Sequence, residues 1–284
     1  NDEMITLAKF LAISGIILPM LPHKNLIPDI NLTPYSIWLA TVVVSGISYL
    51  SYLLKRYVFH ESGTLVSGII GGLYSSTATI SVLARKSRKA SELEATDYVA
   101  AMLLAVSMMF LRFMILILIF SREIFLSIYP YLLTMAVVAA IVAWFIHSRQ
   151  KRPEDQPAET EEDDSSNPLE FKVALIFAVL FVIFTFLTHY TLVYAGTGGL
   201  NLLSFVSGFS DITPFILNLL QNTGSVAALI ITACSMQAII SNIMVNMFYA
   251  LFFAGKGSKL RPWILGGFGV VITCNLVLLL FFYI

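Results

Sequence analysis

The chain alternates between long apolar segments and short polar breaks, a pattern typical of a protein that crosses a membrane many times. A helix that spans the hydrocarbon core of a bilayer needs about 20 predominantly apolar residues. The segments that approach this length are residues 4–20, 34–57, 63–84, 97–120, 124–147, 169–190, 198–220, 225–253 and 262–284. None of them alternates like a strand, and lipid accepts only helices or closed barrels. The pattern therefore predicts an all-α, polytopic membrane protein with about nine transmembrane helices.

Composition supports this prediction and narrows the range of partners. Of the 284 residues, 58% are apolar and only 12% are charged, whereas soluble domains carry about a quarter charged residues. The formal net charge is zero, so nothing indicates nucleic acid binding. Cys234 and Cys274 lie in apolar runs and match neither a disulfide framework nor a CxxC metal site. We expect buried thiols, a lipid bilayer as the main partner, and no cofactor.

One stretch is too polar to lie in a membrane. Residues 148–166 carry basic and then acidic side chains with proline and serine, which predicts a solvated cytoplasmic linker or, alternatively, a regulatory ion-binding segment. The strongest basic cluster, residues 85–89, should be cytoplasmic by the positive-inside rule. With nine crossings, the linker and the C-terminus share the side of this cluster. Lys259 and Arg261 then fall on the opposite side.

Two apolar segments begin in the same way, which indicates an internal repeat. Thr33-Pro34 and Asn167-Pro168 each place a polar N-cap before a proline, and they are 134 residues apart. We infer two membrane repeats of about four helices each, residues 33–147 and 167–284, preceded by an extra N-terminal helix in residues 1–32. Four crossings per repeat make the repeats parallel. An inverted pair needs an odd number, for example if one polar stretch enters and leaves on the same side.

The first polar stretch inside an apolar segment is residues 68–81. Its small residues recur every four positions, which lets helix backbones approach closely. Five hydroxyl side chains between residues 75 and 81 exceed what packing requires. Packing is therefore one interpretation, and a solute site with a locally unwound backbone is the other. The candidate solute-binding residues in this stretch are Ser75, Ser76, Thr77 and Thr79.

The second polar stretch, residues 207–214, contains Asp211, Thr213 and Pro214. The proline, interpreted as the first residue of a new helix, supports a helix break at about 211–213, and broken helices at membrane depth are tolerated only where they are buried or line a cavity. Alternatively, Asp211 simply caps the next segment. Arg112 is the other charge well inside an apolar segment, where each charge costs about 2.5–3.5 kcal/mol. Either the two charges offset each other, or Asp211 binds a cation.

Two amide side chains complete the candidate site. Asn242 and Asn246 are four residues apart, on one face of the same predicted helix. Their oxygens can coordinate a cation or bind a polar group. In the alternative interpretation they form interhelical hydrogen bonds, each worth about 0.6 kcal/mol.

Six motifs resemble a known family: the membrane domain of unknown function that lies C-terminal to MgtC/SapB-type domains in bacteria. They are residues 18–22 (Leu-Pro-Met-Leu-Pro), 71–78 (Gly-Gly-Leu-Tyr-Ser-Ser-Thr-Ala), 83–88 (Leu-Ala-Arg-Lys-Ser-Arg), 110–112 (Phe-Leu-Arg), 167–170 (Asn-Pro-Leu-Glu) and 207–211 (Ser-Gly-Phe-Ser-Asp). The resemblance covers nearly the whole chain. It implies a multi-pass protein of the bacterial inner membrane.

The chain departs from this family at two positions. The family pattern has a second acidic residue where this chain has Thr213, and a lysine where it has Asn246. Because an acid and a base are missing together, we predict that residues 213 and 246 are neighbours in space. The change also argues against a two-carboxylate metal site. Asp211 remains the best metal candidate, although a divalent cation usually takes several oxygen ligands.

These features favour a secondary transporter or channel for a small ion or polar solute, with its site at the repeat interface. The alternative is a non-transporting scaffold, or a regulatory or sensor module, with a closed core in which Arg112 and Asp211 pair. We do not expect an enzyme. Residues 208–211 are similar to the Gly-x-Gly-Asp motif of aspartyl intramembrane proteases, but Asp97, the candidate second carboxylate, lies near the start of a segment. Whether the protein forms a homodimer stays open.

Overall fold

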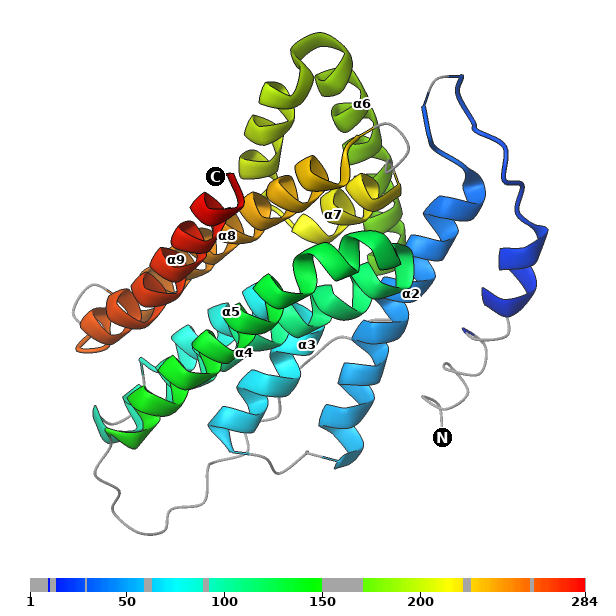
Figure 1. Cartoon of the computed structure of the whole chain (residues 1–284). Helices are drawn as coiled ribbons and strands as arrows, with labels where there is room; N and C mark the ends of the chain where they lie inside the picture. Colours follow the sequence, from blue (N-terminus) through cyan, green and yellow to red (C-terminus); the bar gives the residue numbers. More distant parts are fainter. Residues whose placement is uncertain are drawn as a thin grey trace.

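The computed structural model describes residues 10, 14–28, 30–58, 63–88, 92–149, 171–221, 226–255 and 258–283, and within them it is helical without a strand (Figure 1). The main elements are α2 (Pro34–Leu53), a π-helical turn η1 (Leu54–Val58), α3 (Thr64–Lys86), α4 (Glu92–Phe120), α5 (Arg122–Ser148), α6 (Phe171–Ser207), α7 (Ile212–Gln221), α8 (Ala228–Ala254) and α9 (Arg261–Tyr283). Seven of these helices are long and apolar enough to cross a membrane: α2, α3, α4, α5, α6, α8 and α9. The chain is therefore an integral, multi-pass membrane protein.

The predicted count of nine crossing helices is not confirmed. Most of segment 4–20 lies outside the described residues. Segment 198–220 does not form one crossing helix, because the backbone leaves helical geometry near residues 208–211. The segment is divided between the end of α6 and the ten residues of α7, which span only about 15 Å.

The predicted start of the second apolar segment is confirmed in detail. The Thr33 hydroxyl accepts a hydrogen bond from the Ser36 backbone N–H at 3.0 Å. In return, the Ser36 hydroxyl accepts from the Thr33 N–H at 3.1 Å. Pro34 occupies the first turn, where helical N–H groups have no helical partner. The corresponding pair at 167–168 and almost all of the linker 148–166 lie outside the described residues.

α6 consists of two arms, residues 171–195 and 197–207, which meet at Gly196. This residue has φ +59° and ψ −152°, a conformation that side chains other than hydrogen rarely tolerate. The two arms form the sharp bend at the top of Figure 1. The chain thus reverses direction inside an apolar segment.

The second arm of α6 and α7 together form a hairpin, here named the second hairpin (residues 197–221). The Ser204 hydroxyl donates to Gln237 Oε1 at 2.9 Å, and the Ser241 hydroxyl donates to the Phe205 carbonyl at 2.7 Å. Residue numbers therefore rise together along both partners, so this arm runs parallel to α8. α7 then runs back and ends near the start of α8 (Figure 1). The hairpin enters and leaves the bundle at the same end.

α3 is also broken, at Ser75, whose backbone is extended (φ −158°, ψ 106°). The half before the break, residues 64–74, runs parallel to α4. A methyl group on Gly68 would lie 2.3 Å from the Ala101 carbonyl oxygen, and one on Gly72 would lie 2.5 Å from the Ala105 Cα. Backbone contact this close is what the small residues at four-residue spacing permit.

The half of α3 after the break, residues 76–86, folds back toward the end where α3 began. A methyl group on Gly71 would lie 2.5 Å from the Thr79 hydroxyl, whereas eight residues of straight helix separate two positions by about 12 Å. Just beyond this half, Arg88 donates to the Phe252 carbonyl at 3.2 Å, at the end of α8. Residues 64–86 are therefore a first hairpin, which enters from the end of the bundle opposite to the second.

This folding back corrects the predicted arrangement of charges. The guanidinium of Arg85 lies 4.3 Å from the centre of the Phe253 ring, at the end of α8, where the connection to α9 begins. Lys259 in that connection and Arg261 at the start of α9 therefore lie at the same end as residues 85–88, and the expectation of opposite sides is wrong. The C-terminus lies at the other end, since α9 runs back along α5 (Figure 1). The reason is that the first hairpin adds no net crossing.

We predict that Tyr131→Phe destabilises the packing of α5 against α9. The Tyr131 hydroxyl donates to Asn275 Oδ1, and both side chains are buried. Removing the hydroxyl leaves this oxygen without a donor in an apolar environment, which costs about 1–2 kcal/mol. The free energy of unfolding in mixed micelles measures the loss. Tyr129→Phe, at an exposed position on the same helix, is the control, and an equal effect of both substitutions would contradict the prediction.

Candidate functional site

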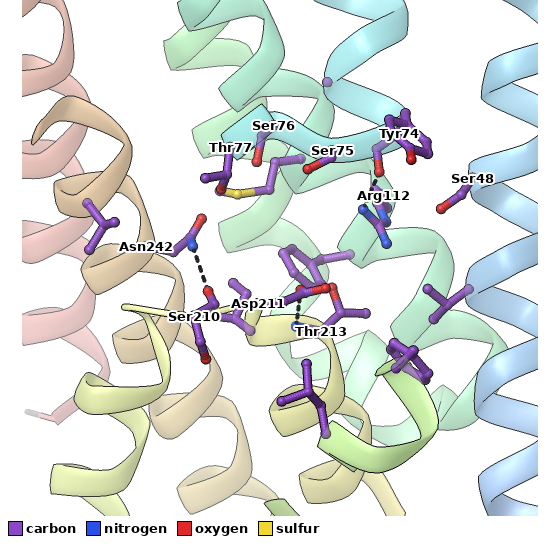
Figure 2. A pocket seen from close by; sticks show the side chains of 18 of the residues that line it. Ser48, Tyr74, Ser75, Ser76, Thr77, Arg112, Ser210, Asp211, Thr213 and Asn242 are labelled. Atoms are coloured by element: carbon purple, nitrogen blue, oxygen red, sulfur yellow. Dashed lines mark hydrogen bonds between the residues drawn. The ribbon is translucent and has the colours of Figure 1, made fainter. Parts of the chain in front are cut away.

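A cavity of about 400 Å³ lies where the tips of the two hairpins meet (Figure 2). Residues of α2, α4, the first arm of α6 and α8 also line it. Gly72, at the first tip, packs on the fourteenth of 29 residues in α4, and Gly208, at the second tip, packs on the fourteenth of 27 residues in α8. The cavity therefore lies near the middle of the two helices. Its polar lining residues are Ser45, Ser48, Tyr74, Ser75, Ser76, Thr77, Arg112, Ser210, Asp211, Thr213, Asn242 and Tyr249.

The structure brings together most of the residues predicted from the sequence. Seven of the nine candidates line the cavity: Ser75, Ser76, Thr77, Arg112, Asp211, Thr213 and Asn242. Thr79 does not line it, because its side chain packs inside the first hairpin against Gly71. Asn246 does not line it either, because its amide points to Asn242.

At the first tip, the break places the C-terminal end of the first half of α3 and the N-terminal end of its second half at the cavity. The Ser75 hydroxyl accepts a long hydrogen bond, 3.4 Å, from the Ala78 N–H, as an N-cap side chain does. The second half of α3 therefore begins at the cavity. On the other side of the break, the Tyr74 carbonyl, which ends the first half, accepts a hydrogen bond from Arg112 Nη1 at 2.8 Å.

At the second tip, Asp211 combines the two roles that the sequence left open. Its Oδ1 accepts a hydrogen bond from the Thr213 N–H at 2.9 Å and so caps α7. The same side chain is exposed and lines the cavity. The sequence predicts Pro214 as the first residue of a helix, but in the structure it is the third residue of α7. It still belongs to the first turn, where a missing N–H leaves no helical hydrogen bond unmade.

Arg112 is the most buried charged side chain described in the bundle, with 9% of its surface exposed. Its Nη1 donates to the Tyr74 carbonyl, whereas its Nε has no hydrogen-bond partner. Asp211 faces the same cavity (Figure 2), but these two described residues form no ion pair, so any mutual compensation acts through space. The guanidinium is thus held in place while part of its hydrogen-bonding capacity stays unused.

The two asparagines tie α8 to the second tip. Asn242 Nδ2 donates to the Gly208 carbonyl at 3.2 Å and, more weakly, to the Ser210 carbonyl at 3.5 Å. Asn246 Nδ2 donates to Asn242 Oδ1 at 3.1 Å. For Asn242 this is hydrogen bonding to another element, the alternative left open by the sequence, whereas the hydrogen bond of Asn246 stays within α8. Thr213 and Asn246 are both buried, and their predicted proximity stays a prediction.

Sequence reasoning missed the contribution of α2. Ser45 and Ser48 line the cavity opposite the hairpin tips. They lie three residues apart, on one face of a helix, in a segment we had interpreted as an ordinary span. The signal available in the sequence was this spacing of small hydroxyl residues.

Among the described residues, the cavity lining provides no ligand set for a divalent metal. Within the described part of the chain, no group of three or more His, Cys, Asp or Glu side chains is placed to hold a metal ion. Asp211 is the carboxylate at the cavity, and Ca²⁺ or Mg²⁺ takes about six oxygen ligands.

Comparison with known proteins places the chain in a family. It is 25% identical over 227 residues to an uncharacterized protein of Aquifex aeolicus (strain VF5), a match that covers 78% of this chain and 96% of that protein. No solved structure matches the present chain. A family model described as a domain of unknown function also matches the chain, which agrees with the family resemblance. The association with MgtC/SapB-type domains stays a prediction. The model of the family described as domain of unknown function DUF4010 matches residues 42–254, most of the chain, and the protein therefore belongs to this family.

Proposed function

We propose that the protein is a secondary transporter or channel for a small ion or polar solute, with its site at the cavity between the hairpin tips. The observation that carries this proposal is that two helix breaks, Arg112 and Asp211 converge on one cavity. Non-helical backbone at membrane depth is tolerated only where it is buried in protein or lines a cavity. A buried charge inside a span marks a functional site by default.

A repeated contact pattern supports an internal duplication. Gly68 packs on Ala101 in the first half of the chain, and Ser204 contacts Gln237 in the second, with both residue numbers higher by 136. The contact of Gly72 with Ala105 corresponds in the same way to that of Gly208 with Ser241. Each half then contains three crossing helices and one hairpin. An odd number of crossings makes the repeats inverted, a common plan of transporters that bind solute at the repeat interface.

The charges of the bundle ends support an orientation. Arg85 and Arg88 lie at the end of α8, and Lys259 and Arg261 follow that end in the chain. Arg149 lies two residues after His147, which pairs with Asp97 near the start of α4 at the same end of the bundle. By the positive-inside rule, this end faces the cytoplasm, and a bacterial inner membrane is the compartment that fits. Lipid covers the apolar exposed faces, and a homodimer stays open.

The competing functions make different structural demands. A scaffold or sensor module needs a closed core with Arg112 and Asp211 paired, which differs from the geometry described above. An aspartyl protease needs a second carboxylate that shares a proton with the first. Asp97 instead pairs with His147 at 2.6 Å, and it is not a cavity residue. We therefore propose a non-enzymatic role.

Accessibility labelling tests the proposal without knowledge of the solute. In a background with Cys234→Ala and Cys274→Ala, Ser48→Cys places one thiol at the cavity and Leu50→Cys places one on the exposed apolar face of the same helix. A charged thiol reagent that cannot cross membranes should label the first variant from both sides of a vesicle and the second from neither. Failure to label Ser48→Cys from either side would overturn transport and favour the scaffold.

A further inference from the structure

We propose that the ligand of this cavity is a small organic carboxylate, bound between the Arg112 guanidinium and the N-terminal end of the second half of α3. This inference rests on the proposed function and specifies its substrate class. Four observations carry it: the helix ends at the cavity, the way these ends are compensated, the unpartnered part of Arg112, and the apolar wall beside it.

At each negative helix end at the cavity, a carbonyl group already accepts a hydrogen bond from a side chain. The first half of α3 ends at the Tyr74 carbonyl, which accepts from Arg112. The second arm of α6 leads into the Gly208 and Ser210 carbonyls, which accept from Asn242. These carbonyl groups are the ones that would otherwise coordinate a cation. Their engagement by protein donors argues against a cation site at the tips.

The positive helix ends are compensated unequally. A helix N-terminus carries about half an elementary positive charge, and two helices begin at this cavity, the second half of α3 and α7. The end of α7 is neutralised by the Asp211 carboxylate that caps it. The end of α3 is capped only by the neutral Ser75 hydroxyl, at 3.4 Å. Its uncompensated charge favours an anion.

The unpartnered part of Arg112 is the third observation, and it does not depend on the helix ends. The side chain is more than nine-tenths buried, it lines the cavity, and its Nε lacks a partner. In Figure 2 its guanidinium lies beside the broken backbone of α3 and faces the space between the two tips. The planar guanidinium matches a carboxylate, which accepts two parallel hydrogen bonds from it. A carboxylate there would use the Nε donor, which no described residue engages.

The surroundings of Arg112 favour an organic anion over an inorganic one. Met109 and Phe113 flank it on α4, and Phe177 and Leu180 face the cavity from α6. A bare inorganic anion gains nothing from such a wall. A carboxylate with a short hydrocarbon chain buries that chain against it, at about 0.8 kcal/mol per CH₂. The site therefore fits a monocarboxylate with a few carbon atoms.

Thermal-shift titrations of the purified full chain test this inference at constant ionic strength. The probes are sodium acetate, sodium butyrate, sodium chloride and butylammonium chloride. A ligand that binds only the folded state raises the free energy of unfolding by RT ln(1 + [L]/Kd), and the unfolding temperature rises with it. We expect butyrate to stabilise most, acetate less, and chloride and butylammonium not at all. Arg112→Gln should weaken butyrate binding about tenfold or more, whereas Arg88→Gln, at the end of the bundle, should leave it unchanged.

Asp211→Asn distinguishes an anionic ligand from a cationic one even if Arg112→Gln fails to fold. This variant should fold, since asparagine caps helices as well as aspartate does. A carboxylate site keeps or gains butyrate affinity in this variant, because a negative charge leaves the cavity. If butylammonium stabilised the protein and this effect disappeared in Asp211→Asn, the carboxylate ligand would be contradicted, whereas the proposed transport function would still stand. Chloride acting as strongly as butyrate would replace the organic ligand with an inorganic anion. No shift together with an unlabelled Ser48→Cys cavity would remove the proposed function itself.

Discussion

Gly72→Val should lower the unfolding temperature of the protein sharply and abolish a monodisperse folded species in detergent. A Cβ at this position would lie 2.5 Å from the Ala105 Cα and 2.7 Å from the Ala105 carbonyl oxygen. Both atoms belong to the backbone of α4, so neither can rotate away. The first hairpin must then shift as a whole, and the cavity opens with it. Even Gly72→Ala should cost about 1–3 kcal/mol, and the two additional methyl groups of valine should cost more.

Gly46→Ala is the matched control for this prediction. A methyl group on Gly46 meets no atom within 4 Å, and alanine is a better helix former than glycine by about 1 kcal/mol. This substitution should therefore leave stability unchanged or raise it slightly. Gly208→Ala should behave like Gly72→Ala, because its Cβ would lie 2.4 Å from the Ser241 side chain. If alanine at positions 46 and 72 had the same effect, the close approach of the first hairpin to α4 would be contradicted.

The contrast between the two hairpins explains what could be predicted from the sequence. The break at the second tip was predictable, because Asp211 and Pro214 are local signals for a helix start. The break at Ser75 carries no such signal, and residues 63–84 have the length and apolarity of an ordinary span. Its extended backbone is stabilised by a tertiary contact, the hydrogen bond from Arg112 to the Tyr74 carbonyl. A locally unwound backbone in this stretch was one of two interpretations of the sequence, and the structure shows the break together with a reversal of direction.

The candidate site divides in a similar way. Charges inside apolar segments are rare and costly, so Arg112 and Asp211 were identifiable from the sequence alone. Thr79 has a hydroxyl group and Asn246 shares a helix face with Asn242, but in the structure Thr79 packs against Gly71 and Asn246 donates within α8. Ser48 was overlooked because the direction a small hydroxyl residue faces depends on which helices surround it. The chemical type of the site residues could therefore be predicted from the sequence, whereas the direction in which each side chain points could not.

Ser48→Trp should abolish uptake through the protein while leaving its fold intact. Ser48 lies on α2 at the wall of the cavity, opposite the hairpin tips. An indole ring there would extend into the space where a solute binds, and it would rest against the apolar wall already present. Butyrate uptake into proteoliposomes should fall to background, and butyrate should no longer shift the unfolding temperature. The unfolding temperature without ligand should stay close to that of the wild-type protein.

Two comparisons separate a blocked cavity from a damaged protein. Leu50→Trp places the same ring two residues away on the same helix, at a position that is 60% exposed on the apolar outer face, and uptake should persist. Labelling of Ser75→Cys by a charged thiol reagent gives a readout that does not depend on the solute, and adding Ser48→Trp should slow it to background. Continued labelling and uptake with tryptophan at position 48 would mean that the solute passes elsewhere. The cavity would then be a packing defect between two hairpins. Filling a solute-binding site with an indole ring must block transport, so a cavity that tolerates the ring is not that site.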